Sequence, residues 1–282
     1  MKNIISISVI LLVFSGCISK KITESEVFNP IKEFELISDF TFNRNLLVKN
    51  DSTEIETWLL TKPNAEFNLV YISGNGSNIR SAIPFFNSLG KQANLNIFSF
   101  NYSGYGLSTG TPSINGIIDD AKLAIQYFSE IKDNNIPTIL MGYSLGGYVA
   151  LQISNSSFID KVILLSTFTS AEELEGYLIK EALPQIIRPF LKLDIDKKVY
   201  DLNNLISLND LDKPILILHG EKDDFIPPKM GKRLFDLSKS KQKYFVEIRG
   251  ADHRTVLKDD GKSSIVATEI IQFLNLNHTV SK

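Results

Sequence analysis

A serine stands between two glycines directly after an apolar run. The segment reads Thr138-Ile-Leu-Met-Gly142-Tyr-Ser144-Leu-Gly146 and continues into a helical pattern. A G-x-S-x-G motif between a buried strand and a helix forms a nucleophile elbow, because the glycines leave room for a sharp, strained turn that exposes the serine hydroxyl. The helix that starts at the serine points free N–H groups toward developing negative charge. Ser144 is therefore the predicted nucleophile.

Two other kinds of glycine-rich site fit this segment poorly. A phosphate-binding P-loop needs Gly-Lys followed by Ser or Thr, and the chain has no such run. In a dinucleotide-binding fingerprint, residues 143–145 would occupy positions that require glycine. A purely structural turn is the remaining alternative to a nucleophile.

The three histidines differ in their suitability as a general base. Sites built on such an elbow use the chain order serine, then Asp or Glu, then histidine. His219 precedes the acids and suits a structural role, and His278 lies in the tail as a surface residue. His253 follows the apolar run 244–248 and precedes a helical segment. His253 is therefore predicted to take the proton of Ser144.

The acid that orients this histidine belongs in the loop after the apolar run 215–218. Glu221, Asp223 and Asp224 all lie in that loop, and each of them could accept a hydrogen bond from the imidazole. The residues not used for this purpose would be solvated loop charges or helix caps. The local pattern leaves the choice open.

An oxyanion hole is predicted from two backbone N–H groups. One donor follows the nucleophile, and the other comes from the loop after an earlier strand. The apolar run 69–72 ends in Ser73-Gly-Asn75-Gly, a loop of that kind. The predicted donors are the amides of Leu145 and Asn75, with a simple turn at Asn75 as the alternative.

The remaining pattern predicts an α/β fold with a mostly parallel, doubly wound sheet. Short apolar runs suit strands buried on both faces, and they occupy residues 69–72, 97–100, 138–141, 162–165, 215–218 and 244–248. Apolar residues with a helical period lie between them, at 117–131, 231–238 and 263–274. Earlier segments suggest half-exposed antiparallel strands at 35–40, 44–49 and 54–61. Residues 170–212 interrupt the alternation and predict a small helical cap over the carboxyl ends of the strands.

Composition narrows the possible partners. Thirty basic and 32 acidic residues give a net charge of −2 with no basic block, which argues against nucleic acid. The single cysteine excludes a cysteine-ligated zinc site and an intrachain disulfide, so no metal is expected. A serine nucleophile activated by a histidine needs no cofactor.

The amino terminus has the pattern of a secretory signal. Lys2 is followed by an apolar core of about ten residues and then by Ser15-Gly-Cys17, whereas a membrane span needs about 20 apolar residues. The single cysteine at the end of this stretch resembles the lipobox of bacterial lipoproteins, although Phe14 is bulkier than usual. That resemblance implies a signal peptide at 1–16, lipidated Cys17 and a membrane-anchored protein of the cell envelope; a plain secretory signal or an uncleaved anchor is the alternative. Residues 17–34 are expected to be a tether, and 35–282 the folded domain.

Taken together, the motifs resemble the α/β-hydrolase superfamily, especially its serine aminopeptidase-like and monoacylglycerol lipase-like branch, and also depalmitoylating thioesterases. The resemblance spans roughly residues 66–275. Its motifs are the Ser73-Gly-Asn loop, Asn101-Tyr-Ser-Gly104-Tyr-Gly106-Leu-Ser108-Thr-Gly110, the elbow with Gly147, His219-Gly-Glu-Lys-Asp223-Asp-Phe-Ile-Pro227, and Gly250-Ala-Asp-His253. The fourth motif implies Asp223 as the acid. Two positions depart from the family pattern: Ser73 replaces a histidine, and Asp252 stands where small or polar residues are common.

The resemblance implies a serine hydrolase that cleaves carboxylic esters or thioesters through an acyl-enzyme, with a small acyl substrate as its partner. A medium acyl chain would suit the apolar residues expected in the cap, which equally suit ordinary packing. A peptidase of the aminopeptidase-like branch is one alternative, and it would need an acidic site for the substrate amine at Glu172, Glu173 or Glu175. A catalytically idle binding protein is the other.

Overall fold

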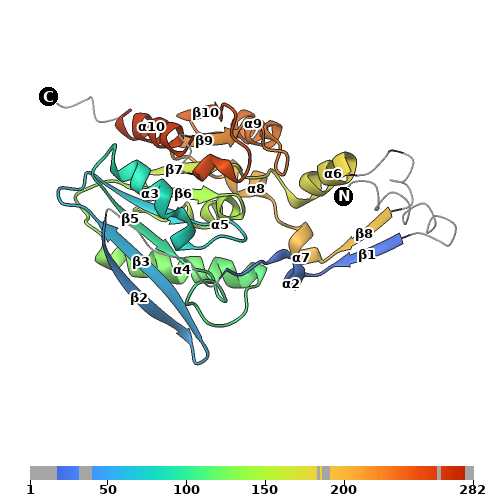
Figure 1. The fold of residues 1–282 in the computed structure, drawn as a ribbon, viewed down its shortest axis with the longest axis horizontal. Helices are drawn as coiled ribbons and strands as arrows, with labels where there is room; N and C mark the ends of the chain where they lie inside the picture. The colour runs from blue at the N-terminus through green and yellow to red at the C-terminus, as the bar shows by residue number, and fades with distance from the viewer. Residues whose placement is uncertain (1–17, 32–39, 183–184, 186–190, 259–261, 277–282) are drawn as a thin grey trace.

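A computed structural model of the chain describes residues 18–31, 40–182, 185, 191–258 and 262–276. Figure 1 shows a single large twisted sheet with helices on both sides. Its eight strands lie in the order β10-β9-β7-β6-β4-β5-β3-β2. The strands are β2 (Thr41–Asn50), β3 (Thr53–Thr61), β4 (Phe67–Ile72), β5 (Leu95–Phe100), β6 (Thr138–Tyr143), β7 (Lys161–Leu165), β9 (Ile215–Gly220) and β10 (Lys243–Ile248).

The strands from β10 to β5 pair in parallel, whereas β3 and β2 are antiparallel to their neighbours. Each apolar run predicted as a buried strand falls within one of these six parallel strands. The predicted mostly parallel, doubly wound sheet is therefore confirmed. The strand predicted at 35–40 lies largely outside the described residues.

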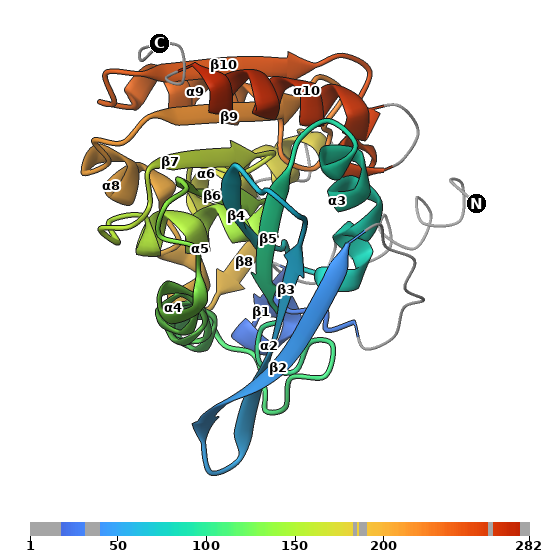
Figure 2. The same ribbon diagram turned by 90° about the vertical axis from the view of Figure 1, so that its left-hand side faces the viewer.

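Helices cover both faces of the sheet, and each face has its own apolar core (Figure 2). Alternate residues of a strand point to opposite faces, so Val70 and Leu140 join one core while Leu69 and Met141 join the other. The first core includes residues of α4 (Ile114–Ile131), α5 (Leu145–Ile153), α8 (Asn204–Asn209) and α9 (Pro228–Leu237). The second includes residues of η1 (Ile79–Ala82), α3 (Ile83–Gly90), η3 (Thr255–Leu257) and α10 (Lys262–Asn275).

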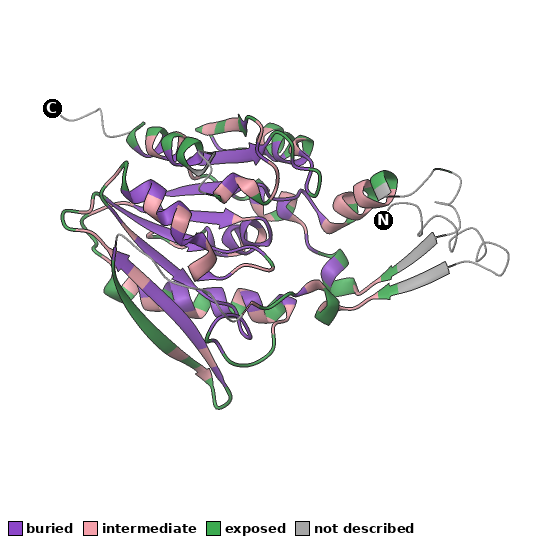
Figure 3. Ribbon diagram, viewed as in Figure 1, coloured by how far each residue is buried: buried purple, intermediate pink, exposed green. Residues whose placement is uncertain are grey.

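Strand β3 differs from the half-exposed strand expected from its sequence. Figure 3 shows it largely buried, while its neighbour β2 at the sheet edge is mostly exposed. Polar residues are buried in β3 because they find partners: the Glu56 carboxylate accepts hydrogen bonds from Trp58 Nε1 at 2.7 Å and Asn101 Nδ2 at 2.6 Å. The alternation of Glu and Thr with apolar residues predicts that one face of β3 is in contact with solvent. In the structure both faces of β3 are largely buried.

Residues 171–209 depart from the regular alternation. They contain α6 (Ala171–Ala182), a strand β8 (Leu191–Ile195), α7 (Lys197–Tyr200) and then α8. Strand β8 pairs in parallel with β1 (Ile18–Ile22), in a two-stranded sheet that projects from the main body (Figure 1). The segment is thus part helix and part strand.

The described part of the expected tether is structured. After β1 the chain forms α2 (Glu24–Val27), and the Glu24 carboxylate interacts with Lys198 at 3.4 Å and with the amide of Ile114. The polar sequence does not reveal this strand, because its hydrogen-bonding partner lies about 170 residues further along the chain. The predicted signal peptide and Cys17 lie outside the described residues. No helix of the described ranges is both long and apolar enough to cross a membrane.

Candidate active site

The predicted nucleophile lies on a strained turn at the carboxyl end of β6. Ser144 has φ 54° and ψ −119° and is the N-cap of α5. Such a conformation costs a non-glycine residue about 1–3 kcal/mol and clusters at functional sites. The Thr167 hydroxyl donates to the Ser144 carbonyl oxygen at 2.7 Å. The local sequence does not reveal this contact, because Thr167 follows another strand, β7.

The two motif glycines are required by close backbone contacts. A Cβ on Gly142 would lie 2.2 Å from the Gly146 carbonyl oxygen, and a Cβ on Gly146 would lie 2.2 Å from the Ile72 carbonyl oxygen. Real Cβ atoms do not approach other atoms so closely. The helix after the serine therefore packs directly on the end of β4, which carries the predicted oxyanion loop.

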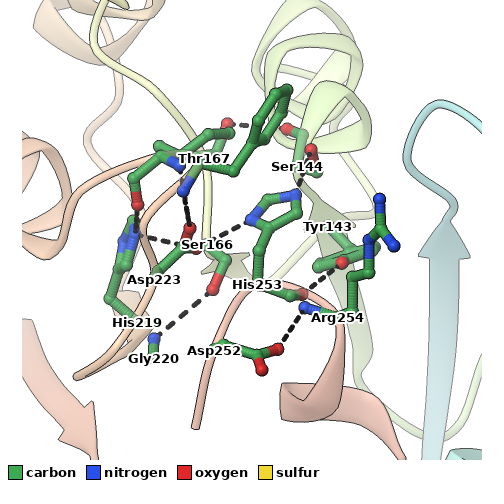
Figure 4. Close-up of polar contacts among 12 residues, drawn as sticks. Tyr143, Ser144, Ser166, Thr167, His219, Gly220, Asp223, Asp252, His253 and Arg254 are labelled. Atoms are coloured by element: carbon green, nitrogen blue, oxygen red, sulfur yellow. Dashed lines mark hydrogen bonds and ion pairs between the residues drawn. The ribbon is translucent and has the colours of Figure 1, made fainter. Parts of the chain in front are cut away.

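Three side chains from distant loops meet at this turn (Figure 4). His253 Nε2 lies 3.1 Å from Ser144 Oγ, and His253 Nδ1 lies 2.7 Å from Asp223 Oδ2. Ser144 is 8% exposed and Asp223 is 3% exposed, so the chain of hydrogen bonds lies largely out of water. The residues predicted as nucleophile, base and acid are thus in mutual contact.

Two backbone amides and two histidine side chains contact the Asp223 carboxylate. Its Oδ1 accepts hydrogen bonds from the amides of Phe225 at 3.1 Å and Ile226 at 2.8 Å. Burial raises the pKa of Asp223, but hydrogen bonds from His219 and His253 outweigh burial and lower this pKa to about 2. An ionised carboxylate only accepts hydrogen bonds, so Nδ1 of His253 carries a proton and Nε2 is free to accept one.

The other residues considered for the triad lie elsewhere. Asp224 is exposed at the rim of the cleft, and a Glu221 carboxylate oxygen accepts a hydrogen bond from the Gly250 amide at 2.7 Å. His219 is buried with Nε2 2.8 Å from the Ile226 carbonyl oxygen and 3.5 Å from Asp223 Oδ2. His278 lies outside the described residues.

Two aromatic rings hold the imidazole of His253. The Tyr143 ring stacks on it at 5.4 Å between centroids, and the Phe225 ring lies at 5.2 Å. The Tyr143 hydroxyl also donates to the His253 carbonyl oxygen at 2.5 Å, and burial raises the pKa of this phenol so that it stays protonated. Neither ring could be assigned this role from the sequence, because both occupy positions that the motifs leave variable.

The predicted oxyanion loop lies against the nucleophile. A Cβ on Gly74 would be 3.0 Å from Ser144 Cβ, so the loop backbone passes beside the serine. Asn75 follows and lines the cleft. Leu145 is the first residue of α5, where a helix leaves its amide without an intrahelical acceptor. The Ser73 hydroxyl is buried and has no hydrogen-bond partner among the described residues.

A cleft of about 1060 Å³ opens above Ser144 and His253. Its apolar lining includes Pro84, Phe225 and Leu257. Its charged lining consists of Asp224, Asp252, Arg254 and Lys258. Asp252 is turned toward its own loop, where its carboxylate accepts the amides of Arg254 and Thr255. Within the described ranges, no group of three or more His, Cys, Asp or Glu side chains could hold a metal ion.

The parallel sheet, the elbow and the Ser–His–Asp contacts define the α/β-hydrolase class. Residues 63–202 match the sequence profile of the family described as serine aminopeptidase, S33. The protein YfhR of Salmonella typhimurium is 31% identical over 215 residues, which cover 70% of each chain, and a membrane protein of Saccharomyces cerevisiae is 27% identical over 82% of this chain and 80% of its own. This chain belongs to the α/β-hydrolase superfamily, in the same family as YfhR.

A solved structure agrees with that assignment at the level of the fold. The esterase Pf2001 of Pyrococcus furiosus superposes with a TM-score of 0.69 at 17% identity, covering 89% of this chain and 97% of the esterase. The predicted superfamily is therefore confirmed, and with it the expectation of a hydrolase fold.

Proposed function

We propose that this protein is a serine hydrolase that cleaves carboxylic esters or thioesters through an acyl-enzyme, with Ser144 as nucleophile, His253 as base and Asp223 as acid. The observation that carries the proposal is the pair of contacts at 3.1 Å and 2.7 Å linking the three side chains on a strained elbow. These distances lie within the hydrogen-bond reach expected of a nucleophile, its base and the group that orients the base.

The acylation half begins with attack of Ser144 Oγ on the substrate carbonyl carbon, while the hydroxyl proton passes to His253 Nε2. Asp223 stabilises the imidazolium that forms and keeps the ring in the tautomer that leaves Nε2 free. The carbonyl π electrons move to the oxygen, which becomes an oxyanion. Collapse of this intermediate expels the alcohol or thiol, which takes the proton from His253, and leaves the acyl group on Ser144.

The amides of Leu145 and Asn75 are the proposed donors to the oxyanion. Leu145 offers the free N–H of the first helical turn, and the Asn75 loop passes beside Ser144 because Gly74 has no side chain. Fixed donors of this kind contribute about 2.7–4 kcal/mol each to transition-state stabilisation.

The deacylation half repeats the same chemistry with water. His253 takes a proton from the water, the resulting hydroxide attacks the acyl carbon, and the second tetrahedral intermediate collapses. Ser144 Oγ leaves with the proton returned by His253, and the carboxylic acid departs. No group other than the three side chains and the two amides is required for this cycle.

A direct test measures hydrolysis of acyl esters and acyl thioesters of graded chain length. We expect turnover that disappears in Ser144→Ala and persists in the control Ser129→Ala, whose hydroxyl donates to the Gln126 carbonyl oxygen of its own helix. If no ester or thioester in the panel is turned over in a Ser144-dependent way, the proposed activity is refuted and a catalytically idle binding protein is favoured. The panel also separates esters from thioesters.

A peptidase is the second candidate, favoured by the description of the matched family. Glu173 gives this peptidase candidate limited support as a site for the substrate amine. Its carboxylate already accepts the Thr169 hydroxyl at 2.5 Å and lies 3.5 Å from Arg233. Neither Glu172 nor Glu175 is among the described residues that line the cleft. Aminoacyl anilides in the same panel test this candidate: turnover faster than that of matched esters would support it.

For localisation, we propose a lipoprotein of the cell envelope acylated at Cys17, with the membrane as a partner. The apolar segment that ends in Ser15-Gly-Cys17 supports this, as does the description of the yeast relative as a membrane protein. Labelling with a fatty-acid analogue should mark the wild type and spare Cys17→Ser, which should either leave the membrane fraction or remain unprocessed. A processed Cys17→Ser protein that stays membrane-bound would contradict lipidation.

A further inference from the structure

The segment Val27–Asn29 lies across the loop that carries Asn75. Phe28 is 7% exposed and belongs to the core on the side of α4 and α5, so it anchors this segment. The Asn29 amide donates to Asn75 Oδ1 at 2.9 Å, and Asn75 Nδ2 donates to the Val27 carbonyl oxygen. We call residues 27–29 the strap.

A tyrosine completes the contact between the strap and the loop. The Tyr105 hydroxyl donates to Asn75 Oδ1 at 2.7 Å and lies 3.2 Å from the amide of Asn29. It also accepts a hydrogen bond from the amide of Gly76, and burial raises the pKa of this phenol, which keeps its donor proton. Both polar atoms of the Asn75 side chain are therefore occupied by groups outside its own loop.

Further contacts fix the loop after Asn75. The Ile31 carbonyl oxygen accepts the amide of Gly106 at 2.8 Å and the side-chain amide of Asn78 at 3.2 Å. Asn78 in turn caps η1, where its side chain accepts the Ser81 amide at 3.0 Å. The oxyanion loop is thus held between the amino-terminal segment and the core.

We propose that the strap positions the oxyanion loop: Asn29, Val27 and Tyr105 grip the Asn75 side chain and so fix the direction of the Asn75 N–H. The inference rests on the proposed serine hydrolase function. Asn75 is exposed and its side chain is turned to the strap, so the side chain is a positioning group while the backbone N–H is the donor. The segment that follows Cys17 by only ten to twelve residues thereby becomes part of the catalytic apparatus.

The strap would act by preorganising the Asn75 N–H. An oxyanion donor is effective because it is already aimed at the developing charge and does not reorient during the reaction. A glycine on each side of Asn75 gives its loop little stiffness of its own. Hydrogen bonds to three separate groups supply the missing rigidity.

Asn75→Ala tests the proposal, because it keeps the backbone N–H and removes the side-chain hydrogen bonds to the strap and to Tyr105. We expect kcat to fall by about 10- to 100-fold with little change in KM, less than the roughly 10²–10³-fold cost of losing a donor altogether. The second-order rate of labelling by a fluorophosphonate, whose P=O group would occupy the same hole, should fall in parallel. Tyr105→Phe should lower kcat in the same direction, and the double variant should fall by less than the product of the two single effects.

Asn45→Ala is the matched control, since it removes another asparagine–tyrosine hydrogen bond, 2.7 Å to Tyr127, at the sheet edge far from the cleft. It should leave kcat unchanged. Thermal melting of every variant checks folding, so a loss of kcat in a protein with an unchanged melting temperature is a positioning effect. Wild-type kcat in both Asn75→Ala and Tyr105→Phe would overturn the inference while leaving the proposed function intact; an inactive wild type would instead refute the function.

Discussion

Substitution of Gly146 by alanine tests how tightly the elbow is packed on the neighbouring strand. The new Cβ would lie 2.2 Å from the Ile72 carbonyl oxygen and 2.6 Å from that of Ser73, whereas real contacts stay above 3.0 Å. Helix α5 and the end of β4 must therefore separate by about 0.8 Å. The atoms that must move are backbone, so no side chain can rotate away to relieve the overlap.

Two losses follow from that separation. Forcing an extra methyl group into a packed site costs about 1–3 kcal/mol of unfolding free energy. The same shift moves Ser144 relative to Asn75, and a misplacement of about 1 Å can lower kcat by about 10²-fold. Urea-induced unfolding and kcat/KM with an activated ester measure the two losses separately.

Gly176→Ala is the control for the change of residue type. Gly176 lies exposed in α6 with no atom within 4 Å of an added Cβ, so alanine should stabilise the helix by about 0.5–1 kcal/mol and leave kcat/KM unchanged. Wild-type stability and activity in Gly146→Ala would refute this prediction. Such a result would mean that α5 and the end of β4 can accommodate a methyl group without moving apart, contrary to the contact distances.

Three more predictions concern the groups around the imidazole. Asp223→Asn should lower kcat by about 10⁴-fold, as expected when the base loses its correct tautomer, while Asp224→Asn stays close to wild type; kinetics with the reverse result would move the acid to Asp224. Because its pKa in the folded protein is lowered to about 2, ionised Asp223 stabilises the fold above about pH 4, and about 2 kcal/mol of this is lost as the pH falls from about 5 to about 2. Denaturant titrations should therefore show the stability difference between wild type and Asp223→Asn shrinking by that amount; a constant difference would contradict it. Tyr143→Phe removes the hydrogen bond to the His253 carbonyl oxygen and should lower the unfolding free energy by about 1 kcal/mol, measured in urea, with unchanged stability as the contrary result.

The parallel sheet and the elbow were predictable because their signals are local. Short apolar runs mark strands buried on both faces, and the apolar positions of β4 and β6 divide between two cores as a period of two requires. The glycines of the elbow are contiguous with the serine, so one stretch of sequence contains the whole turn. The chain order of the elbow, the acid loop and the last histidine then restricted which residues could meet.

What the sequence did not reveal depends on contacts between distant segments. The strap is polar and short, and its role is visible only when Asn29 lies beside Asn75, 46 positions away in the chain. The pairing of β1 with β8 joins segments farther apart still. Composition indicates the helix or strand propensity of an isolated segment, whereas these polar segments are ordered by contacts with distant parts of the chain.

The choice among Glu221, Asp223 and Asp224 shows the same limit within one loop. All three acids follow the same strand, and their order in the sequence does not say which carboxylate turns inward. In the structure the amides of Phe225 and Ile226 hold the Asp223 carboxylate beside His253, while Asp224 faces the cleft rim. The resemblance to a family motif pointed to Asp223, and the loop geometry supplies the physical reason.

Peptide mass spectrometry of the covalent adduct formed with a fluorophosphonate tests whether Ser144 is the nucleophile and His253 its base. We expect one adduct per chain, on the peptide that contains Ser144, and labelling at least about 10²-fold slower in His253→Ala, since the imidazole no longer removes the proton. An adduct on another residue, or equally fast labelling of Ser144 in His253→Ala, would contradict it.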